Sequence, residues 1–290
     1  MISVLFAILT AISNASGAVF QRRAAATVPD SEAMRLALIR QLLRQKVWLA
    51  GIGLVMVAAV CQAVALATGP IAVVQPIFVI ELPATLLIAG YVFRAGLPRS
   101  VWAGVAAVTC GLALGMTAAA PGGGSQSVHG LAWIPALILT GVFEALVIIW
   151  SLRLRGNARA ALFGLAAACA YALTAALMKD AVAPLDHGGG AAALFSSWQL
   201  YATGIAGVGA LFLLQNALQA GSLAASQPML TLGDALISIT YGVTLFGETV
   251  RTGWWLLPEL AAVGLITAGC VDLARSPLAG GKPPPPRRVR

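Results

Sequence analysis

The chain has 290 residues, of which 59% are hydrophobic and only 10% are charged, and its mean hydropathy is +0.89. A soluble domain carries roughly 25% charged residues, so this composition excludes a soluble globular protein and a disordered chain and indicates an all-α polytopic membrane protein. The net charge of +8 comes from 18 Lys and Arg residues against 10 Asp and Glu residues.

Nine apolar segments follow one another along the chain, and each has about the 20 residues that a spanning helix needs. The first of them has the length of a signal peptide, but Arg22 and Arg23 follow it rather than precede it. This order is typical of a retained helix whose N-terminus lies outside. The sequence therefore predicts about nine transmembrane helices, at 2–20, 47–67, 70–94, 101–119, 131–150, 159–178, 195–219, 223–246 and 254–274.

The positions of the basic residues support this count. With the N-terminus outside, 16 of the 18 Lys and Arg residues fall in the predicted cytoplasmic segments, and only Lys179 and Arg251 do not. Positive charge gathers on the cytoplasmic side of membrane proteins. We therefore expect a multi-pass protein of the plasma (inner) membrane with a cytoplasmic C-terminus, and the positive charge needs no nucleic acid partner to explain it.

Two regions outside the predicted spans are basic. Residues 31–46 have the pattern of an amphipathic helix, which either lies in water or contacts anionic lipid at the inner surface. Residues 275–290 include four consecutive prolines and predict a disordered basic tail on the cytoplasmic side. The glycine run at 122–124 predicts a flexible outer connector. The remainder, residues 1–274, forms a single transmembrane domain.

The chain also contains an internal repeat. GPIAVVQP at 69–76 matches GSLAASQP at 221–228, and the same shift aligns Arg99 with Arg251 and Trp102 with Trp254. We expect repeat 1 at about 1–119, a linker helix at about 131–150 and repeat 2 at about 159–274. Matching helices are five apart, an odd number, so the two repeats cross the membrane in opposite directions. Inverted repeats are common in secondary transporters, whose substrate sites lie near the midplane between the repeats.

Two acidic residues are predicted at that depth. Glu81 and Asp234 each lie about eleven residues into their spans, which places them near the midplane. Charged residues there are costly and usually functional. Gln75 and Gln227, each followed by a proline, lie in the same two spans, and Gln62 lies in the second span. These five residues form the predicted substrate site.

Three interpretations of this site stay open. Carboxylate and amide oxygens are ligands that suit Mg²⁺ or Ca²⁺, with Glu81 and Asp234 as the metal ligands. The two carboxylates could instead exchange protons, because neighbouring acids in a low dielectric release their protons at different pH values. They could also hydrogen-bond neighbouring helices as packing contacts.

Other polar residues of the spans are candidates for the lining of a cavity. Each of them could equally form a hydrogen bond between helices. Near the predicted outer surface we expect Glu248 and Arg251 to lie together. The predicted cavity-lining residues are Asn14, Tyr171, Gln215 and Asn216.

An enzyme is a remote alternative. Residues 231–234, TLGD, are similar to the GxGD element of intramembrane aspartyl proteases. That element has Gly where this chain has Thr231, and it needs a second Asp after Tyr, whereas Glu81 follows Ile80. A partial motif has a high false-positive rate. We therefore expect no enzyme and no cofactor.

The organisation resembles the drug/metabolite transporter superfamily, in its EamA-like group, and most of all the NIPA-type magnesium transporter branch. The resemblance is carried by SVLFAILTAISNASGAVFQRRAA at the start, by Trp48-x-x-Gly51 with AVALATGPIAVVQP, and by LLQNALQAGSLAASQP. It implies transport by alternating access of a divalent cation, chiefly Mg²⁺. The alternatives are a proton-coupled exporter of a small organic metabolite or drug and a non-transporting membrane scaffold. The expected partners are the transported substrate, membrane lipid and a second copy in a homodimer.

Overall fold

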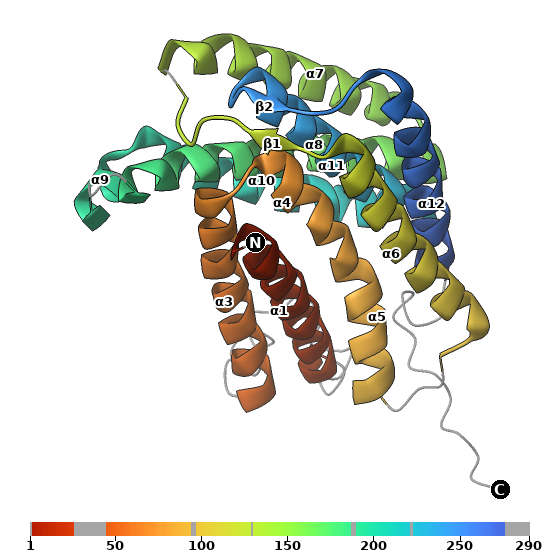
Figure 1. Cartoon of the computed structure of the whole chain (residues 1–290). Helices are drawn as coiled ribbons and strands as arrows, with labels where there is room; N and C mark the ends of the chain where they lie inside the picture. Colours follow the sequence, from red (N-terminus) through yellow and green to blue (C-terminus); the bar gives the residue numbers. More distant parts are fainter. Residues whose placement is uncertain are drawn as a thin grey trace, which may run out of the picture.

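The structure is a computed structural model that describes residues 2–25, 45–93, 97–128, 130–186, 190–220 and 223–275. Most of the amphipathic segment predicted at 31–46, and the basic tail after Arg275, lie outside the described residues. Helices make up nearly all of the described chain (Figure 1). They are α1 (Ile2–Ala25), α3 (Lys46–Thr68), α4 (Ile71–Ile77), α5 (Glu81–Val92), α6 (Arg99–Ala119), α7 (Trp133–Arg153), α8 (Gly156–Asp186), α9 (Gly190–Ser196), α10 (Trp198–Ala220), α11 (Leu223–Thr244) and α12 (Leu256–Ala274).

The all-α membrane architecture is confirmed, while the count of nine spans is met only in part. Within the described residues, eight helical segments are long and apolar enough to cross a membrane. The remaining predicted segment, 223–246, forms α11, which is 22 residues long but falls short of the same apolarity. Ser226, Gln227 and Asp234 lower its hydropathy. Because α11 packs against α8, α12 and α4, it has little need of a lipid-compatible surface.

Apolar side chains cover the outer surface as well as the core. Helix α7 is an example, because most of it faces away from the other helices. Large apolar residues exposed to this extent have no place in water, whereas lipid accommodates them. This surface is that of a membrane protein. The most exposed large apolar side chains of α7 are Leu139, Trp150, Ile138, Leu146 and Leu152.

The third predicted span, 70–94, is not one continuous helix. Helix α4 ends at Ile77, a 3₁₀ turn η2 (Phe78–Ile80) follows, and α5 begins at Glu81. Pro76 lies in the last turn of α4 and has no backbone N–H to donate, so the regular helix is interrupted at this point. The interruption places Glu81 in the first turn of α5.

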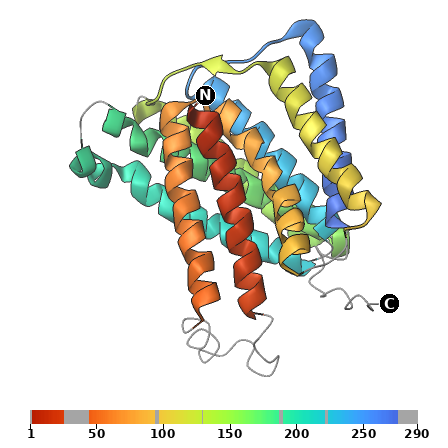
Figure 2. The same ribbon diagram turned by 60° about the horizontal axis from the view of Figure 1, so that its bottom comes forward.

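Helix pairs in the two halves have corresponding neighbours. Helix α1 packs most extensively against α3 and then against α4 and α5, while α8 packs most extensively against α10 and then α11. Between the halves, α6 packs along α12 and α4 along α11. Figures 1 and 2 show α6 and α12 side by side at one edge of the molecule. Glycines permit these close approaches, since a Cβ on Gly104 would lie 3.1 Å from the Gly269 carbonyl oxygen.

A two-stranded ladder joins the halves at one end of the bundle. Strands β1 (Gly122–Gly123) and β2 (Glu248–Thr249) pair antiparallel, with Gly122 opposite Thr249. The Ser125 N–H also donates to the Phe246 carbonyl oxygen at 2.6 Å. The prediction of a flexible connector at 122–124 is therefore wrong, because this segment is hydrogen-bonded to the loop before α12. We call this the strand end. The opposite, basic end carries the helix termini with Lys46, Arg99, Arg153 and Arg275.

Candidate functional site

Glu81 and Asp234 lie close enough to interact although they come from different halves. Helices α4 and α11 pack against one another, with Ile71 beside Gly242. The residues that follow Ile71 therefore meet those that precede Gly242, between the two ends of the bundle. Leu82, next to Glu81, and Leu232, two residues before Asp234, pack against the same apolar cluster. The two carboxyl groups lie within electrostatic range of each other and of the Tyr171 hydroxyl of α8. We call Glu81 and Asp234 the acid pair.

The two acids differ in their hydrogen bonds. Glu81 Oε2 accepts a hydrogen bond from Asn14 Nδ2 of α1 at 3.4 Å. The Oδ1 atom of Asp234 is shielded from solvent and has no hydrogen-bond partner among the described residues. The Ser238 hydroxyl, one turn further along α11, also has no partner that meets the geometric criterion for a hydrogen bond, but it lies near enough to the Asp234 carboxylate to act on it as a donor. The structure therefore brings together four of the residues predicted for the site and its lining, and it leaves acceptor capacity on Asp234 unused.

This arrangement determines what the acid pair can bind. The only ion pair among the described residues lies elsewhere, at the strand end, so neither Glu81 nor Asp234 has a basic partner within the described chain. Carboxylates in a low-dielectric interior are costly unless a proton, a cation or hydrogen-bond donors neutralise them. The acid pair is therefore suited to take up protons or a positively charged ligand.

The remaining residues predicted for the site and its lining differ in their burial and hydrogen bonds. Gln75 is buried in α4, whereas Gln62 of α3 and Gln227 of α11 are partly buried. The Asn216 side-chain amide donates to the Phe212 carbonyl of its own helix at 2.8 Å, so this donor serves α10 itself. The side chain of Gln215 lies outside the described residues. Among the described residues, no group of three or more His, Cys, Asp or Glu side chains is arranged to hold a metal ion.

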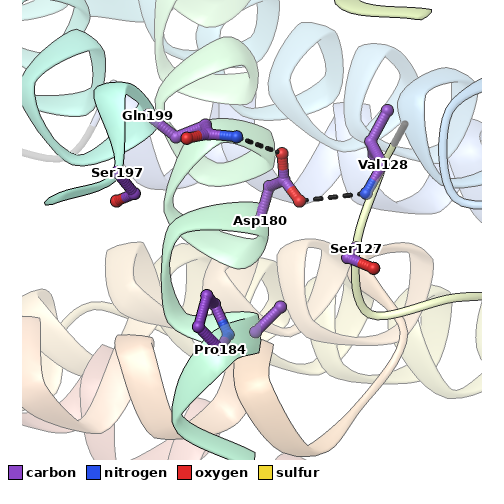
Figure 3. A pocket seen from close by; sticks show the side chains of 7 residues that line it. Ser127, Val128, Asp180, Pro184, Ser197 and Gln199 are labelled. Atoms are coloured by element: carbon purple, nitrogen blue, oxygen red, sulfur yellow. Dashed lines mark hydrogen bonds between the residues drawn. The ribbon is translucent and has the colours of Figure 1, made fainter. Parts of the chain in front are cut away.

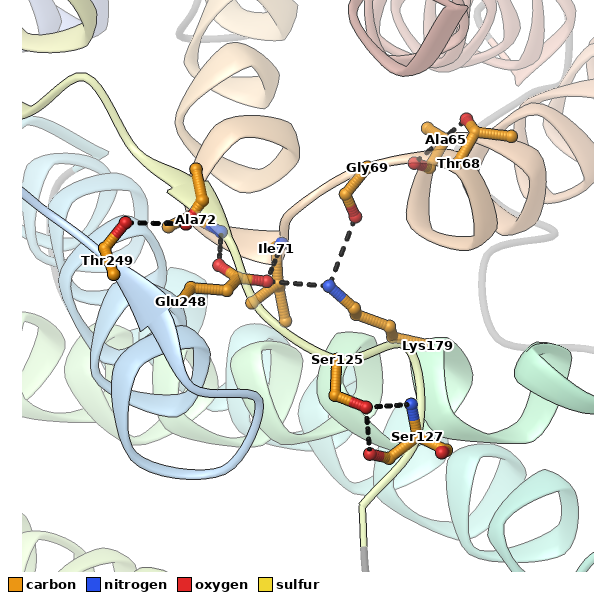
Figure 4. Close-up of polar contacts among 11 residues, drawn as sticks. Ala65, Thr68, Gly69, Ile71, Ala72, Ser125, Ser127, Lys179, Glu248 and Thr249 are labelled. Carbon is orange, nitrogen blue, oxygen red and sulfur yellow. Dashed lines mark hydrogen bonds and ion pairs between the residues drawn. The ribbon is translucent and has the colours of Figure 1, made fainter.

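A second polar cluster lies at the strand end (Figure 4). Lys179 Nζ of α8 lies 2.6 Å from Glu248 Oε1 of β2, and both side chains are almost completely buried. The Glu248 carboxylate also accepts hydrogen bonds from the backbone N–H groups of Ile71, at 2.6 Å, and Ala72, at 2.8 Å. Lys179 Nζ further donates to the Gly69 carbonyl oxygen at 3.2 Å. We call Lys179, Glu248 and the start of α4 the capped junction.

The capped junction corrects one prediction. Glu248 was expected to lie beside Arg251 at the outer surface, but its carboxylate turns inward to Lys179 and α4. Arg251 is exposed and lies over the Trp255 ring, with its Cζ atom 5.0 Å from the ring centroid. The difference arises because the first backbone N–H groups of a helix need acceptors, and an acid at this position supplies two.

Glycines make room for the Glu248 side chain. Gly247 has a φ of +64°, a conformation that side-chain-bearing residues rarely adopt, and it turns the chain so that Glu248 points inward. A Cβ on Gly242 would collide with the Glu248 carboxylate, and a Cβ on Gly124 would lie 2.6 Å from Glu248 Cγ. The aromatic ring of Phe246 covers Lys179, whose Nζ is 4.7 Å from the ring centroid.

Asp180, next to Lys179, organises a pocket nearby (Figure 3). Its Oδ1 accepts from the Val128 backbone N–H at 2.9 Å, and its Oδ2 accepts from Trp133 Nε1 at 2.7 Å and Gln199 Nε2 at 2.9 Å. The pocket has a volume of about 410 Å³. Because three donors already satisfy the Asp180 carboxylate, its evident role is to fasten α7 and α10 to α8.

The sequence does not predict the partners that Glu248 and Asp180 have at the strand end. One signal was available, since Lys179 is one of only two basic residues outside the predicted cytoplasmic segments. A lysine at the end of the bundle where basic residues are rare needs a local partner. In the structure this partner is the buried Glu248 carboxylate. The sequence placed Lys179 after a helix that it ended at 178, whereas α8 continues to Asp186.

Comparison with known proteins gives one informative match. The chain is similar to an uncharacterized protein of Corynebacterium glutamicum, with 27% identity over 270 residues that cover 91% of this chain and 90% of that protein. No family model and no solved structure matches the chain. At this coverage the match includes residues of both halves.

Proposed function

We propose that this chain is a secondary transporter of the drug/metabolite type, in which the acid pair binds the transported cation or the protons that drive transport. The observation that carries the proposal is the meeting of Glu81 and Asp234, one from each half, without a basic partner among the described residues. Two carboxylates held in this way form a site that a cation or a proton can occupy and leave.

The neighbours of the helices support an inverted repeat. In the first half α1 contacts α3 and α5, and in the second half α8 contacts α10 and α11, which are the helices that the sequence repeat aligns with them. The two most extensive contacts between the halves, α6 with α12 and α4 with α11, also join aligned helices, while α3 contacts α8 to a smaller extent. A site between such repeats can be exposed to each side in turn when one half rocks against the other.

Mg²⁺ is the first substrate to test, because carboxylate and amide oxygens are the ligands that it prefers. We would measure Mg²⁺ flux into proteoliposomes that contain a trapped indicator, for the wild type and for Glu81→Gln. The wild type is expected to exceed empty liposomes and the variant to match them. Asp272→Asn is the control, since Asp272 is an exposed acid on α12. Equal flux in the wild type and Glu81→Gln, with both proteins folded, would contradict a role for the acid pair.

One contact favours a second candidate, proton-coupled export of a small organic cation or metabolite. Asn14 approaches Glu81 with its amide N–H₂, a donor that stabilises a carboxylate and cannot coordinate a metal. If this candidate is correct, Mg²⁺ flux is absent and a pH gradient drives accumulation of the organic substrate. Glu81→Gln and Asp234→Asn would then lose the pH-driven accumulation and keep downhill exchange.

A further inference from the structure

The capped junction connects parts of the chain that belong to different halves. Helix α4 belongs to the first half, while Lys179 in α8 and Glu248 in β2 belong to the second. Three polar contacts join the halves, all among buried groups: the N–H groups of Ile71 and Ala72 donate to the Glu248 carboxylate, and Lys179 Nζ donates to the Gly69 carbonyl oxygen. The Lys179–Glu248 ion pair lies within the second half and holds these two partners of α4 together. The β1–β2 ladder adds a second connection between the halves, since Glu248 itself pairs with Gly123. Any movement of one half away from the other at this end must break these contacts.

The capped junction also lies between the acid pair and the strand end. Ile71 precedes Glu81 by ten residues, about 15 Å of helix, and Gly242 follows Asp234 by eight residues, about 12 Å. The α4–α5 span that carries Glu81 therefore begins at the junction, and α11, which carries Asp234, reaches it near its C-terminal end. A Cβ on Gly242 would collide with the Glu248 carboxylate there, and the Ile71 N–H donates to the same carboxylate. A ligand moving from the acid pair to the strand end along these two helices meets the closed contact.

The chemistry of the junction suits a contact that opens. A buried ion pair is weak evidence for stability, because the cost of removing both charges from water offsets much of their attraction. When such a pair separates into water, each ion regains its hydration. An apolar contact of the same size loses its whole burial energy on separation. A Lys–Glu pair is therefore a closure that excludes water when shut and is less costly to open.

From these observations we infer that the capped junction is the strand-end gate of the transporter. Closed, as in this structure, it separates the acid pair from the side that the strand end faces, which the basic residues predict to be the outside. It opens when the start of α4 leaves the Glu248 carboxylate and the Gly69 carbonyl oxygen leaves Lys179, which admits water to the ion pair and lets Lys179 and Glu248 part. The inference rests on the proposed transport function for its role, while the opening itself can be measured without transport.

The first experiment measures opening by chemical labelling. Gln75, one helical turn beyond Ile71, is replaced by cysteine in a chain whose four native cysteines are changed to alanine. A membrane-impermeant maleimide is added on the strand-end side. Glu248→Gln and Lys179→Met should label at least about tenfold faster than their parent, which equals a shift of about 1.4 kcal/mol in the closed–open equilibrium. Arg251→Gln, a charge change at the same end, should label at the parent rate. Unchanged labelling in both junction variants would overturn the gate.

The second experiment keeps Lys179 and Glu248 intact. Gly122 and Thr249 face each other across the ladder, and a side chain on Gly122 meets no atom within 4 Å. Facing residues of antiparallel strands are close enough for a disulfide. Oxidised Gly122→Cys/Thr249→Cys should lose transport and regain it with reductant, while the single variants ignore the oxidant. Full transport by the cross-linked protein would overturn the gate. Absence of flux in the wild type would instead count against the proposed function, and the labelling result would still decide the gate.

Discussion

The acid pair and the capped junction are two buried acidic sites with opposite surroundings. At the junction, Glu248 has a lysine and two backbone N–H groups within 2.8 Å. In the acid pair, Glu81 has a 3.4 Å contact with Asn14, and Asp234 Oδ1 has no hydrogen-bond partner among the described residues. The comparison teaches that burial alone does not identify a binding site. A fully satisfied acid holds the fold together, whereas an acid with unused acceptors is available for a ligand.

The largest expected effect concerns Glu248, the acid whose carboxylate has a full set of partners. Lys179→Met leaves Glu248 buried without its counter-charge, which should lower the free energy of unfolding by about 3–5 kcal/mol. The measurement is denaturant titration in mixed micelles. Lys179→Met/Glu248→Gln should recover part of the loss, because it removes the unpaired charge. Arg251→Gln should stay within about 0.5 kcal/mol of the wild type. A Lys179→Met protein as stable as Arg251→Gln would show that the junction contributes little.

A smaller effect is expected when a new side chain fills the space beside Glu248. Gly242→Ala forces its new methyl group against the Glu248 carboxylate and the Ile71 side chain, so we expect a loss of about 1–3 kcal/mol in the free energy of unfolding. Gly141→Ala is the matched control, because a Cβ on Gly141 of α7 meets no atom within 4 Å. The same titration should find the control unchanged or slightly stabilised. Similar values for the two variants would mean that Glu248 moves aside without cost.

The smallest expected effect has the opposite sign and concerns Asp234, the acid that has an unused acceptor. Asp234→Asn removes a charge that has no basic partner among the described residues, so the free energy of unfolding should stay the same or rise by about 1 kcal/mol. Thermal unfolding in detergent measures this change. The same variant should be inactive in the flux assay. A clear loss of stability would instead identify Asp234 as a structural acid like Glu248.

The sequence predicted the positions of the helices better than the points at which they end. Runs of about 20 apolar residues and the distribution of arginines located a helix for each of the nine segments, because both signals are local in sequence. The sequence predicted a single span at 70–94 in which Pro76 could loosen the helix, but Pro76 alone does not reveal whether a helix bends, breaks or continues. The meeting of Glu81 with Asp234 could be anticipated because the repeat supplies long-range information that single segments lack.

The capped junction could not be predicted in the same way. Lys179 and Glu248 are 69 residues apart, and Glu248 reaches Ile71 across 177 residues. Neither pairing has a periodic pattern in the sequence, and Arg251, three residues from Glu248, offered a nearer partner that the structure does not use. The turn at Gly247 decides the direction of Glu248, and that depends on a backbone conformation rather than on composition.

The separation of Glu248 from Ile71 has a consequence for biogenesis. A ribosome that adds about 5–20 residues per second needs roughly 9–35 s to extend the chain from Ile71 to Glu248. During that interval the first four helical segments can enter the bilayer, but the start of α4 has not yet met the carboxylate that caps it. The nascent first half therefore waits for the last quarter of the chain, and its maturation is completed by a residue that is translated almost at the end.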